Sequence, residues 1–186
     1  MDIIEEIRAF APLCPQEERD KAAMLAFLRG NDDAFDRANL TAHMTASAWI
    51  VSPDRRRVAM CWHNLYRSWS WIGGHADGER DLLAVAMREA AEETGLATVP
   101  IRKEIFSLEN LTVEGHVKRG VYVPGHVHMN VTYLLAARET ALRPKEDENS
   151  AVAWMTPEEA LEASTEPWMV ERVYRKLIER AAPYMK

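Results

Sequence analysis

Three glutamates gather near the C-terminal end of a predicted helix, where the helix dipole least favours negative charge. Glu89, Glu92 and Glu93 are spaced i, i+3 and i+4, so their side chains share one face. Like charges at these spacings repel by roughly 0.2–0.5 kcal/mol per pair, and the dipole costs each anion a further amount of roughly 0.3–1 kcal/mol. A divalent cation would offset both costs, and oxygen ligands favour Mg²⁺ or Mn²⁺ over zinc. The cluster therefore indicates a metal site rather than a solvated acidic face.

The helix that carries these acids has recognisable ends. Asp81 is suited to cap its first turn and Gly95 to end it in a left-handed conformation, so we expect a helix over residues 82–94. Arg88 precedes the acids and is placed to neutralise one carboxylate. At 100° per residue, we expect the opposite, apolar face to comprise Leu83, Ala84, Met87, Ala90, Ala91 and Thr94.

The surrounding stretch, GGHADGERDLLAVAMREAAEETGL, resembles the Nudix box, whose pattern is G-x5-E-x7-R-E-U-x-E-E-x-G-U with U an aliphatic residue. The box covers residues 74–96, and an upstream hairpin, downstream strands and a terminal helix extend the resemblance over residues 41–182. The positions that fit the pattern are Gly74, Arg88, Glu89, Ala90, Glu92, Glu93, Gly95 and Leu96. One position departs, because Arg80 stands where the first acid is expected and Glu79 lies one place early. Either Glu79 substitutes for that acid or its role is lost.

The resemblance implies an α/β fold, a Nudix-type α/β/α sandwich around a mixed central sheet. We divide the chain into a short N-terminal helical extension, residues 1–40, and a Nudix hydrolase domain, residues 41–186. A dimer contact, a lid or a cover for the sheet are alternative roles for the extension. Hydrophobic patterning predicts a helix over 16–29, strands over 44–51, 57–63, 101–113, 117–123, 126–137 and 151–155, a Gly-rich loop before the box helix, a capping box at 156–159 and a helix over 167–182.

The resemblance also implies an activity. It is hydrolysis of the pyrophosphate linkage of a nucleoside diphosphate linked to another moiety, by attack of water on phosphorus, with Mg²⁺ as cofactor and Mn²⁺ as an alternative. Glu89 and Glu93 are expected as catalytic metal ligands and Glu92 as a further ligand, with Arg88 assisting and the carbonyl of Gly74 as an extra ligand. Glu148 is a candidate remote acid or base, although a solvated loop is an equal reading. Which glutamate acts as general base is left open.

Histidines are frequent near the predicted site. His75 directly follows the Gly-Gly pair, where it could contact a phosphate or a base. His126 and His128 share one face of a strand and could form a metal pair. Neither a cysteine nor a third histidine follows at a metal-binding spacing, so the sequence favours a pocket wall for this pair.

Composition limits the partners and the cellular compartment that we expect for the protein. The 186 residues carry 29 acidic and 23 basic side chains, a net charge of −6, which argues against a nucleic-acid partner. No apolar run approaches the roughly 20 residues that span a bilayer, and the N-terminus lacks a signal-like pattern. We therefore expect a cytoplasmic protein with no membrane partner. The resemblance implies a small nucleotide-type diphosphate as the substrate, and a homodimer is compatible with these features. Cys14 and Cys61 are expected to be reduced thiols.

Two other functions are alternatives for this sequence. A non-catalytic nucleotide-sensing module of the same fold is one alternative, but the complete set of acids in the box favours an enzyme. An isoprenyl-diphosphate isomerase would need a catalytic cysteine, and Cys61 is the one nearby thiol. Residues 111–114, LTVE, match no subgroup marker, so the sequence does not identify the substrate.

Overall fold

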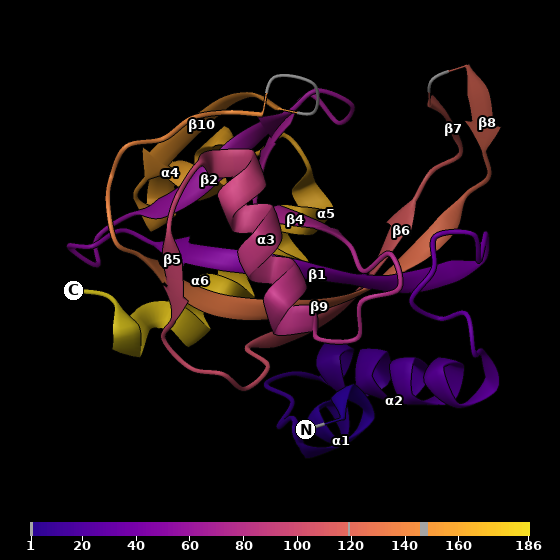
Figure 1. Cartoon of the computed structure of the whole chain (residues 1–186). Helices are drawn as coiled ribbons and strands as arrows, with labels where there is room; N and C mark the ends of the chain where they lie inside the picture. The colour runs from indigo at the N-terminus through magenta and orange to yellow at the C-terminus, as the bar shows by residue number, and fades with distance from the viewer. Residues whose placement is uncertain (1, 119, 146–148) are drawn as a thin grey trace.

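The computed structural model describes residues 2–118, 120–145 and 149–186 (Figure 1). Over these residues, an eight-stranded mixed sheet has the order β10-β2-β1-β9-β5, with β3 beside β2, β4 beside β1 and β6 beside β9. Helices cover both of its faces, as the expected α/β/α sandwich requires. The strands are β1 (Ala42–Val51), β2 (Val58–His63), β3 (Ser68–Ser70), β4 (Ile72–His75), β5 (Thr98–Pro100), β6 (Ser107–Val113), β9 (His126–Ala137) and β10 (Asn149–Met155), with β7 (His116–Lys118) and β8 (Val121–Val123) in a separate hairpin.

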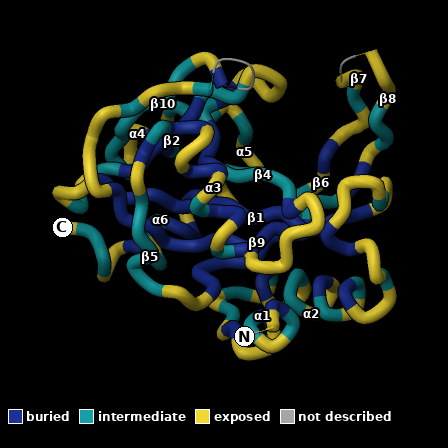
Figure 2. The backbone as a smooth tube through the Cα atoms, viewed as in Figure 1, coloured by how far each residue is buried: buried dark blue, intermediate teal, exposed yellow. Residues whose placement is uncertain are grey.

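Strands β1 and β9 form the centre of the sheet. They run parallel, with Trp49 opposite Leu134 and Ile50 opposite Leu135. Every residue of β1 is buried, as expected for a strand covered on both faces (Figure 2). Because side chains alternate along a strand, Ile50 enters one core and Trp49 the other.

Each core is closed by its own helices. The core around Ile50 is covered by α1 (Ile3–Ala9), α2 (Pro15–Gly30) and α3 (Leu82–Thr94). The core around Trp49 is covered by α4 (Pro157–Ala163), a π-helical segment (Val170–Tyr174) and α6 (Arg175–Ala181). The predicted C-terminal helix is thus interrupted, since α5 (Pro167–Met169) leads into the π segment and a 3-10 turn (Ala182–Tyr184) follows α6.

A buried ion network ties α2 to the sheet and to α6; it consists of Glu17, Glu109, Lys176 and Arg180. The Lys176 Nζ lies 3.3 Å from Glu17 Oε1 and 2.9 Å from Glu109 Oε1. Arg180 approaches Glu17 Oε2 to 2.6 Å, and both glutamates are fully buried. Residues 1–40 therefore contribute both apolar and charged groups to the interior of the sandwich.

Two predicted strands are wrong in extent. The strand expected over 101–113 is present only as β6, because residues 101–106 form a loop; β5 precedes the expected range and also pairs with β9. The strand expected over 117–123 is the β7–β8 hairpin, where Gly120 takes a φ of 81° that reverses the chain.

The start of the box also differs from the expectation. Gly73 and Gly74 lie in strand β4, paired with β1, rather than in a loop. The buried face of α3 is also rotated from the predicted one, since Ala84 and Ala91 are exposed while Glu89 and Glu93 are buried beside Val85 and Ala86. The face differs because Glu89 and Glu93, which are polar, are buried at the cavity instead of facing solvent.

The structure confirms the predicted ends of α3 and the predicted start of α4. The Asp81 side chain accepts a hydrogen bond from Ala84 N, and Gly95 ends α3 with a φ of 71°. Thr156 and Glu159 form the expected capping box at the start of α4. Among the described residues, no helix is both long and apolar enough to span a membrane.

Candidate active site

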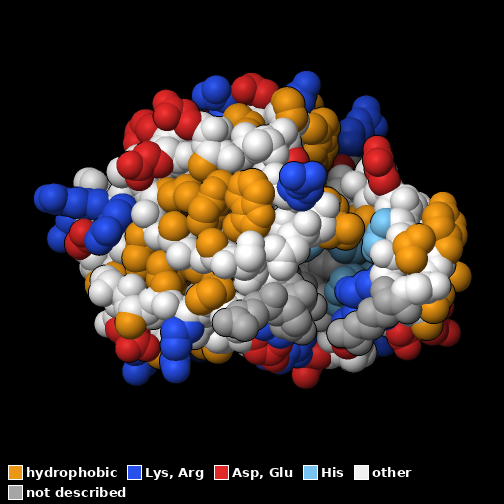
Figure 3. Space-filling view, turned by 90° about the horizontal axis from the view of Figure 1, so that it is seen from above, with side chains coloured by type: hydrophobic (Ala, Val, Ile, Leu, Met, Phe, Trp, Pro, Cys, Tyr) orange, Lys and Arg blue, Asp and Glu red, His pale blue; other side chains and the backbone are white. Residues whose placement is uncertain are grey.

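A cavity of about 810 Å³ opens beside the C-terminal half of α3 and the strands β1, β4 and β9. Figure 3 shows it as a hollow with histidine side chains on its wall. Glu89, Glu92 and Glu93 line one side, and we call them the acidic wall. A histidine cluster lines another side, formed by His43, His75, His126 and His128. The cavity therefore brings together the acids and three histidines named from the sequence, His75, His126 and His128, with His43 as an addition.

The acidic wall is partly buried under β4. Glu89 and Glu93 are only 8% and 6% exposed, whereas Glu92 is exposed. A Cβ atom at Gly74 would lie 2.5 Å from the Glu89 carboxyl carbon, so only glycine leaves room for that side chain. The helix cap and the glycine thus fix where the Glu89 carboxylate sits.

The carboxylates of the acidic wall turn to different partners. Arg88 donates to Glu89 Oε1 at 3.0 Å and to the carbonyl of His75 at 3.2 Å. Lys145 lies 3.2 Å from Glu92, and the Cys61 thiol lies 3.8 Å from Glu93. The three acids share a cavity wall, but they are not drawn together around one point.

Burial raises the pKa of Glu89, and the hydrogen bond from Arg88 offsets this only in part. The nearby charge of Glu92 raises that pKa further. A group of this kind gains from any added cation, so its chemistry fits a hard divalent ion.

Three other positions named from the sequence, Glu79, Arg80 and Glu148, differ in their surroundings. Glu79 lines the cavity and accepts a hydrogen bond from Asp81 N at 2.8 Å. Arg80, at the position of the missing acid, lies over the Phe35 ring at 4.7 Å. Glu148 lies outside the described residues.

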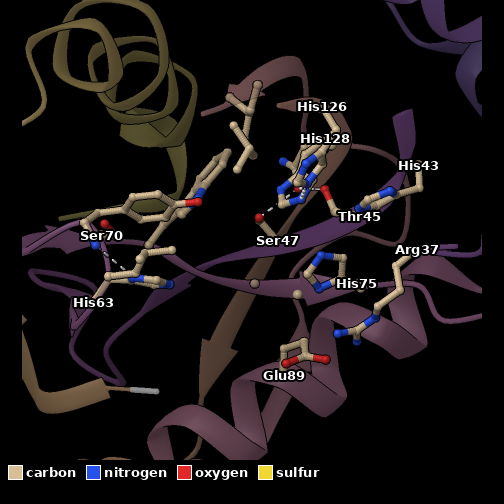
Figure 4. Close-up of a pocket in the computed structure, with 18 of the residues that line it drawn as sticks. Arg37, His43, Thr45, Ser47, His63, Ser70, His75, Glu89, His126 and His128 are labelled. Carbon is tan, nitrogen blue, oxygen red and sulfur yellow. Dashed lines mark hydrogen bonds between the residues drawn. The ribbon is translucent and has the colours of Figure 1, made fainter. Parts of the chain in front are cut away.

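The histidine cluster draws on three adjacent strands (Figure 4). His43 comes from β1 and lies directly opposite His128 of β9, while His75 comes from β4. The ring centroids of His43, His75 and His128 are 4.9–5.1 Å apart. The sequence missed this group because its members are joined by strand pairing rather than by local spacing.

His43, His75 and His128 are held neutral by their surroundings. Burial lowers the pKa of His75 to about 3, and the nearby charge of Arg37 adds to the effect. Burial also lowers the pKa of His43 and of His128. Each imidazole therefore offers a nitrogen lone pair at neutral pH.

Asn130 follows His128 by two residues on β9 and joins the cavity to the protein interior. Its Oδ1 accepts hydrogen bonds from Thr45 at 3.0 Å and Ser47 at 2.9 Å. Its Nδ2 donates to Glu109 Oε2 at 3.1 Å, and Glu109 belongs to the buried ion network. A continuous set of hydrogen bonds thus links the cavity floor to α2.

Cys61 does not have the setting of a catalytic thiol. It is 1% exposed and is not part of the cavity lining. Burial raises the pKa of its thiol well above the ordinary value, and the charge of Glu93 adds to the effect. These observations count against the isomerase alternative.

Comparison with known proteins gives one family. The profile of the family described as NUDIX domain matches residues 41–179. A search of curated proteins gives no match. Similar solved structures include a NUDIX-family hydrolase from Clostridium perfringens, with 18% identity, 73% of this chain and 95% of that chain covered, and a TM-score of 0.54.

Two further structures have the same fold. A C. elegans Ap4A hydrolase in a binary complex is 16% identical, with 75% of this chain and 97% of that chain covered and a TM-score of 0.54. A MutT protein from Methanosarcina mazei Go1 is 15% identical, with 78% and 97% covered and a TM-score of 0.56. At these identities the likeness establishes the fold.

Proposed function

The chain belongs to the Nudix hydrolase family, and from this premise we propose that it cleaves the pyrophosphate linkage of a nucleoside diphosphate linked to another moiety, with Mg²⁺ or Mn²⁺ as cofactor. The observation that carries the proposal is the acidic wall: two buried carboxylates, Glu89 and Glu93, face a cavity large enough for such a ligand. Ligand pockets are typically about 300–1,000 Å³, and this cavity measures about 810 Å³.

Glu89 and Glu93 would hold the cation, with Glu92 and the Gly74 carbonyl as further ligands. When bound, the ion would neutralise the charge that builds up on the diphosphate and acidify a water molecule. Arg88 bridges Glu89 and the His75 carbonyl, so it keeps the carboxylate directed toward the strand that carries Gly74. One of the acids then accepts the proton of the attacking water.

A pair of aromatic rings in the cavity lining supports a nucleotide ligand. His63 and Tyr66 stack with ring centroids 4.4 Å apart and both line the cavity. Tyr66 remains 42% exposed, which leaves a flat aromatic surface against which a base can pack. The cavity thus offers a base platform at one side and hard oxygen ligands at another.

A hydrolysis screen tests the proposal. Wild-type protein is assayed for phosphate or nucleotide release from nucleoside triphosphates, ADP-ribose, dinucleotides and nucleotide sugars, with Mg²⁺, with Mn²⁺ and with chelator. We expect turnover of at least one compound in the presence of metal, and loss of that turnover in Glu89→Gln and Glu93→Gln. The matched control is Glu158→Gln, on the exposed start of α4, which should keep full activity.

The screen also separates the alternatives. No turnover across the panel, combined with nucleotide binding by calorimetry, would support the non-catalytic sensing module. Turnover that persists in both glutamine variants, with folding unchanged by circular dichroism, would contradict the assignment of Glu89 and Glu93.

A further inference from the structure

We propose that His43, His75 and His128 bind one transition-metal ion of the zinc class, with its open coordination position facing the cavity. Each residue offers a ring nitrogen, and these three ligand atoms all lie within 4.8 Å of one another. Tetrahedral zinc with bonds of roughly 2.0–2.1 Å holds its ligands about 3.3 Å apart. Small side-chain rotations therefore suffice to close the three nitrogens around an ion.

The tautomer of His43 leaves a free lone pair. Its Nδ1 lies 3.0 Å from the Asn39 carbonyl oxygen, which can only accept, so Nδ1 carries the hydrogen. The other nitrogen, Nε2, is then a bare acceptor; it is buried and has no hydrogen-bond partner among the described residues. Leaving such an atom unsatisfied costs about 1–3 kcal/mol. A metal ion is a partner that would satisfy it.

His126 sets the ligand atom of His128. The His126 Nδ1 donates to the Pro124 carbonyl at 2.9 Å, which makes its Nε2 an acceptor. His128 Nε2 lies 3.0 Å from that atom and must donate to it, so the Nδ1 of His128 is left bare. Hydrogen bonds that the ring N–H donates to carbonyls and other acceptors orient metal-binding histidines in this way. His126 is therefore a positioning residue for the site.

The scaffold holds the ligands on rigid elements. His43 and His128 are direct partners across the parallel β1–β9 pair, and His75 lies opposite Thr45 on the antiparallel β4. Sites built on strands are more precise than sites on loops. The positive charge of Arg37 nearby is countered by Asp77, whose Oδ1 accepts from Arg37 Nε at 2.5 Å.

Ligand chemistry distinguishes this site from the acidic wall. Neutral imidazole nitrogens suit Zn²⁺, Co²⁺ or Ni²⁺, whereas carboxylates suit Mg²⁺ and Mn²⁺. Among the described residues, these three histidines are the one group whose ligand atoms are already gathered closely enough for a single ion. Three protein ligands leave a fourth position for water or an oxygen of a bound ligand. The histidine site does not depend on the proposed hydrolysis.

Calorimetry with chelator-stripped protein tests the site, with Zn²⁺ as titrant and excess Mg²⁺ present. We expect one equivalent of Zn²⁺ to bind the wild type, and His43→Ala, His75→Ala and His128→Ala each to weaken binding at least tenfold. The matched control is His63→Ala, a cavity histidine outside the cluster, which should bind as the wild type does. Thermal unfolding of each metal-free variant checks that the fold is retained.

Two further variants test whether the ion binds the acidic wall instead and whether His126 positions His128. Glu89→Gln should keep Zn²⁺ binding; loss of binding there, with the histidine variants unaffected, would place the ion on the acidic wall and overturn the proposal. His126→Gln should weaken binding 10–100-fold and change the visible spectrum of the Co²⁺-loaded protein, because the orientation of the His128 ring changes. Absence of Zn²⁺ and Co²⁺ binding to the wild type would also overturn the proposal. Water would then be the partner of the buried His43 Nε2.

Discussion

The buried ion network and the histidine cluster both place polar side chains out of solvent, yet the two regions differ in how those groups are paired. In the network, two carboxylates face a lysine and an arginine, and every charge has a partner at 2.6–3.3 Å. In the cluster, buried and half-buried imidazoles face one another, and the Nε2 of His43 lacks a hydrogen-bond partner within the described residues. The acidic wall is similarly incomplete, since Glu89 is costly to ionise. We infer that the buried ion network stabilises the fold and that the histidine cluster and the acidic wall bind ligands.

The largest expected effect comes from breaking the balanced region. Burial alone would lower the pKa of Lys176, but the attraction of Glu109 and Glu17 outweighs it and leaves that pKa raised. Lys176→Met leaves both glutamates short of a buried partner, so the free energy of unfolding should fall by about 3–5 kcal/mol. Chemical denaturation at pH 7 measures it.

Arg175→Met is the control for this prediction. Arg175 pairs with Glu171 at 2.9 Å on the exposed side of α6, where such pairs contribute about 0–1 kcal/mol. Equal effects of the two substitutions would mean that the buried network does not stabilise the fold in the way described.

The next effect concerns activity rather than stability. Gly74→Ala places a Cβ atom 2.5–2.8 Å from the Glu89 carboxylate atoms and must displace that carboxylate. A displacement of about 1 Å at a reacting centre can cost about 100-fold in rate, so kcat/KM should fall by about that factor. Gly30→Ala, where an added Cβ meets nothing within 4 Å, should leave the rate unchanged. A normal rate for Gly74→Ala would argue against a role for Glu89.

A smaller effect is expected on the stability of the metal-free protein. Because burial raises the pKa of Glu89 in the folded state, its ionisation disfavours folding above its ordinary pKa of 4.5. Glu89→Gln should therefore raise Tm at pH 7, and the gain should disappear as the pH falls below that value and both states become protonated. A thermal-unfolding series against pH measures the difference; a lower Tm for the variant at pH 7 would contradict this account.

The smallest effect is expected for the histidine cluster without metal. His43→Phe removes the unpartnered Nε2 together with the hydrogen bond to Asn39, and these changes oppose each other. The free energy of unfolding should change by less than about 1 kcal/mol, far less than for Lys176→Met. A loss as large as the lysine variant's would show that His43 is a structural residue. The same denaturation experiment decides it.

The sequence predicted what local signals determine. The caps of α3 at Asp81 and Gly95 and the capping box at Thr156 depend on neighbouring residues, and the structure confirms them. The acids of the box were placed together by helical spacing, and they do line one cavity; their metal binding stays a prediction.

Strand pairing determined what the sequence could not show. His43 and His128 are adjacent only because β1 and β9 run parallel in that register. The late start of the strand expected over 101–113 likewise follows from where β6 pairs with β9, after residues 101–106 loop out from β5. The buried ion network joins α2, β6 and α6, which no local pattern connects.

The most direct test of the proposed function is a comparison of metal-dependent turnover between wild type and Glu93→Gln on the first compound that the screen identifies. Our account predicts hydrolysis by the wild type that requires Mg²⁺ or Mn²⁺ and is abolished by chelator, and a loss of at least about 100-fold in kcat for the variant, in the range seen when a charge-stabilising group is removed. Equal turnover by the two proteins, or turnover unaffected by chelator, would contradict the assignment of the acidic wall as the catalytic metal site.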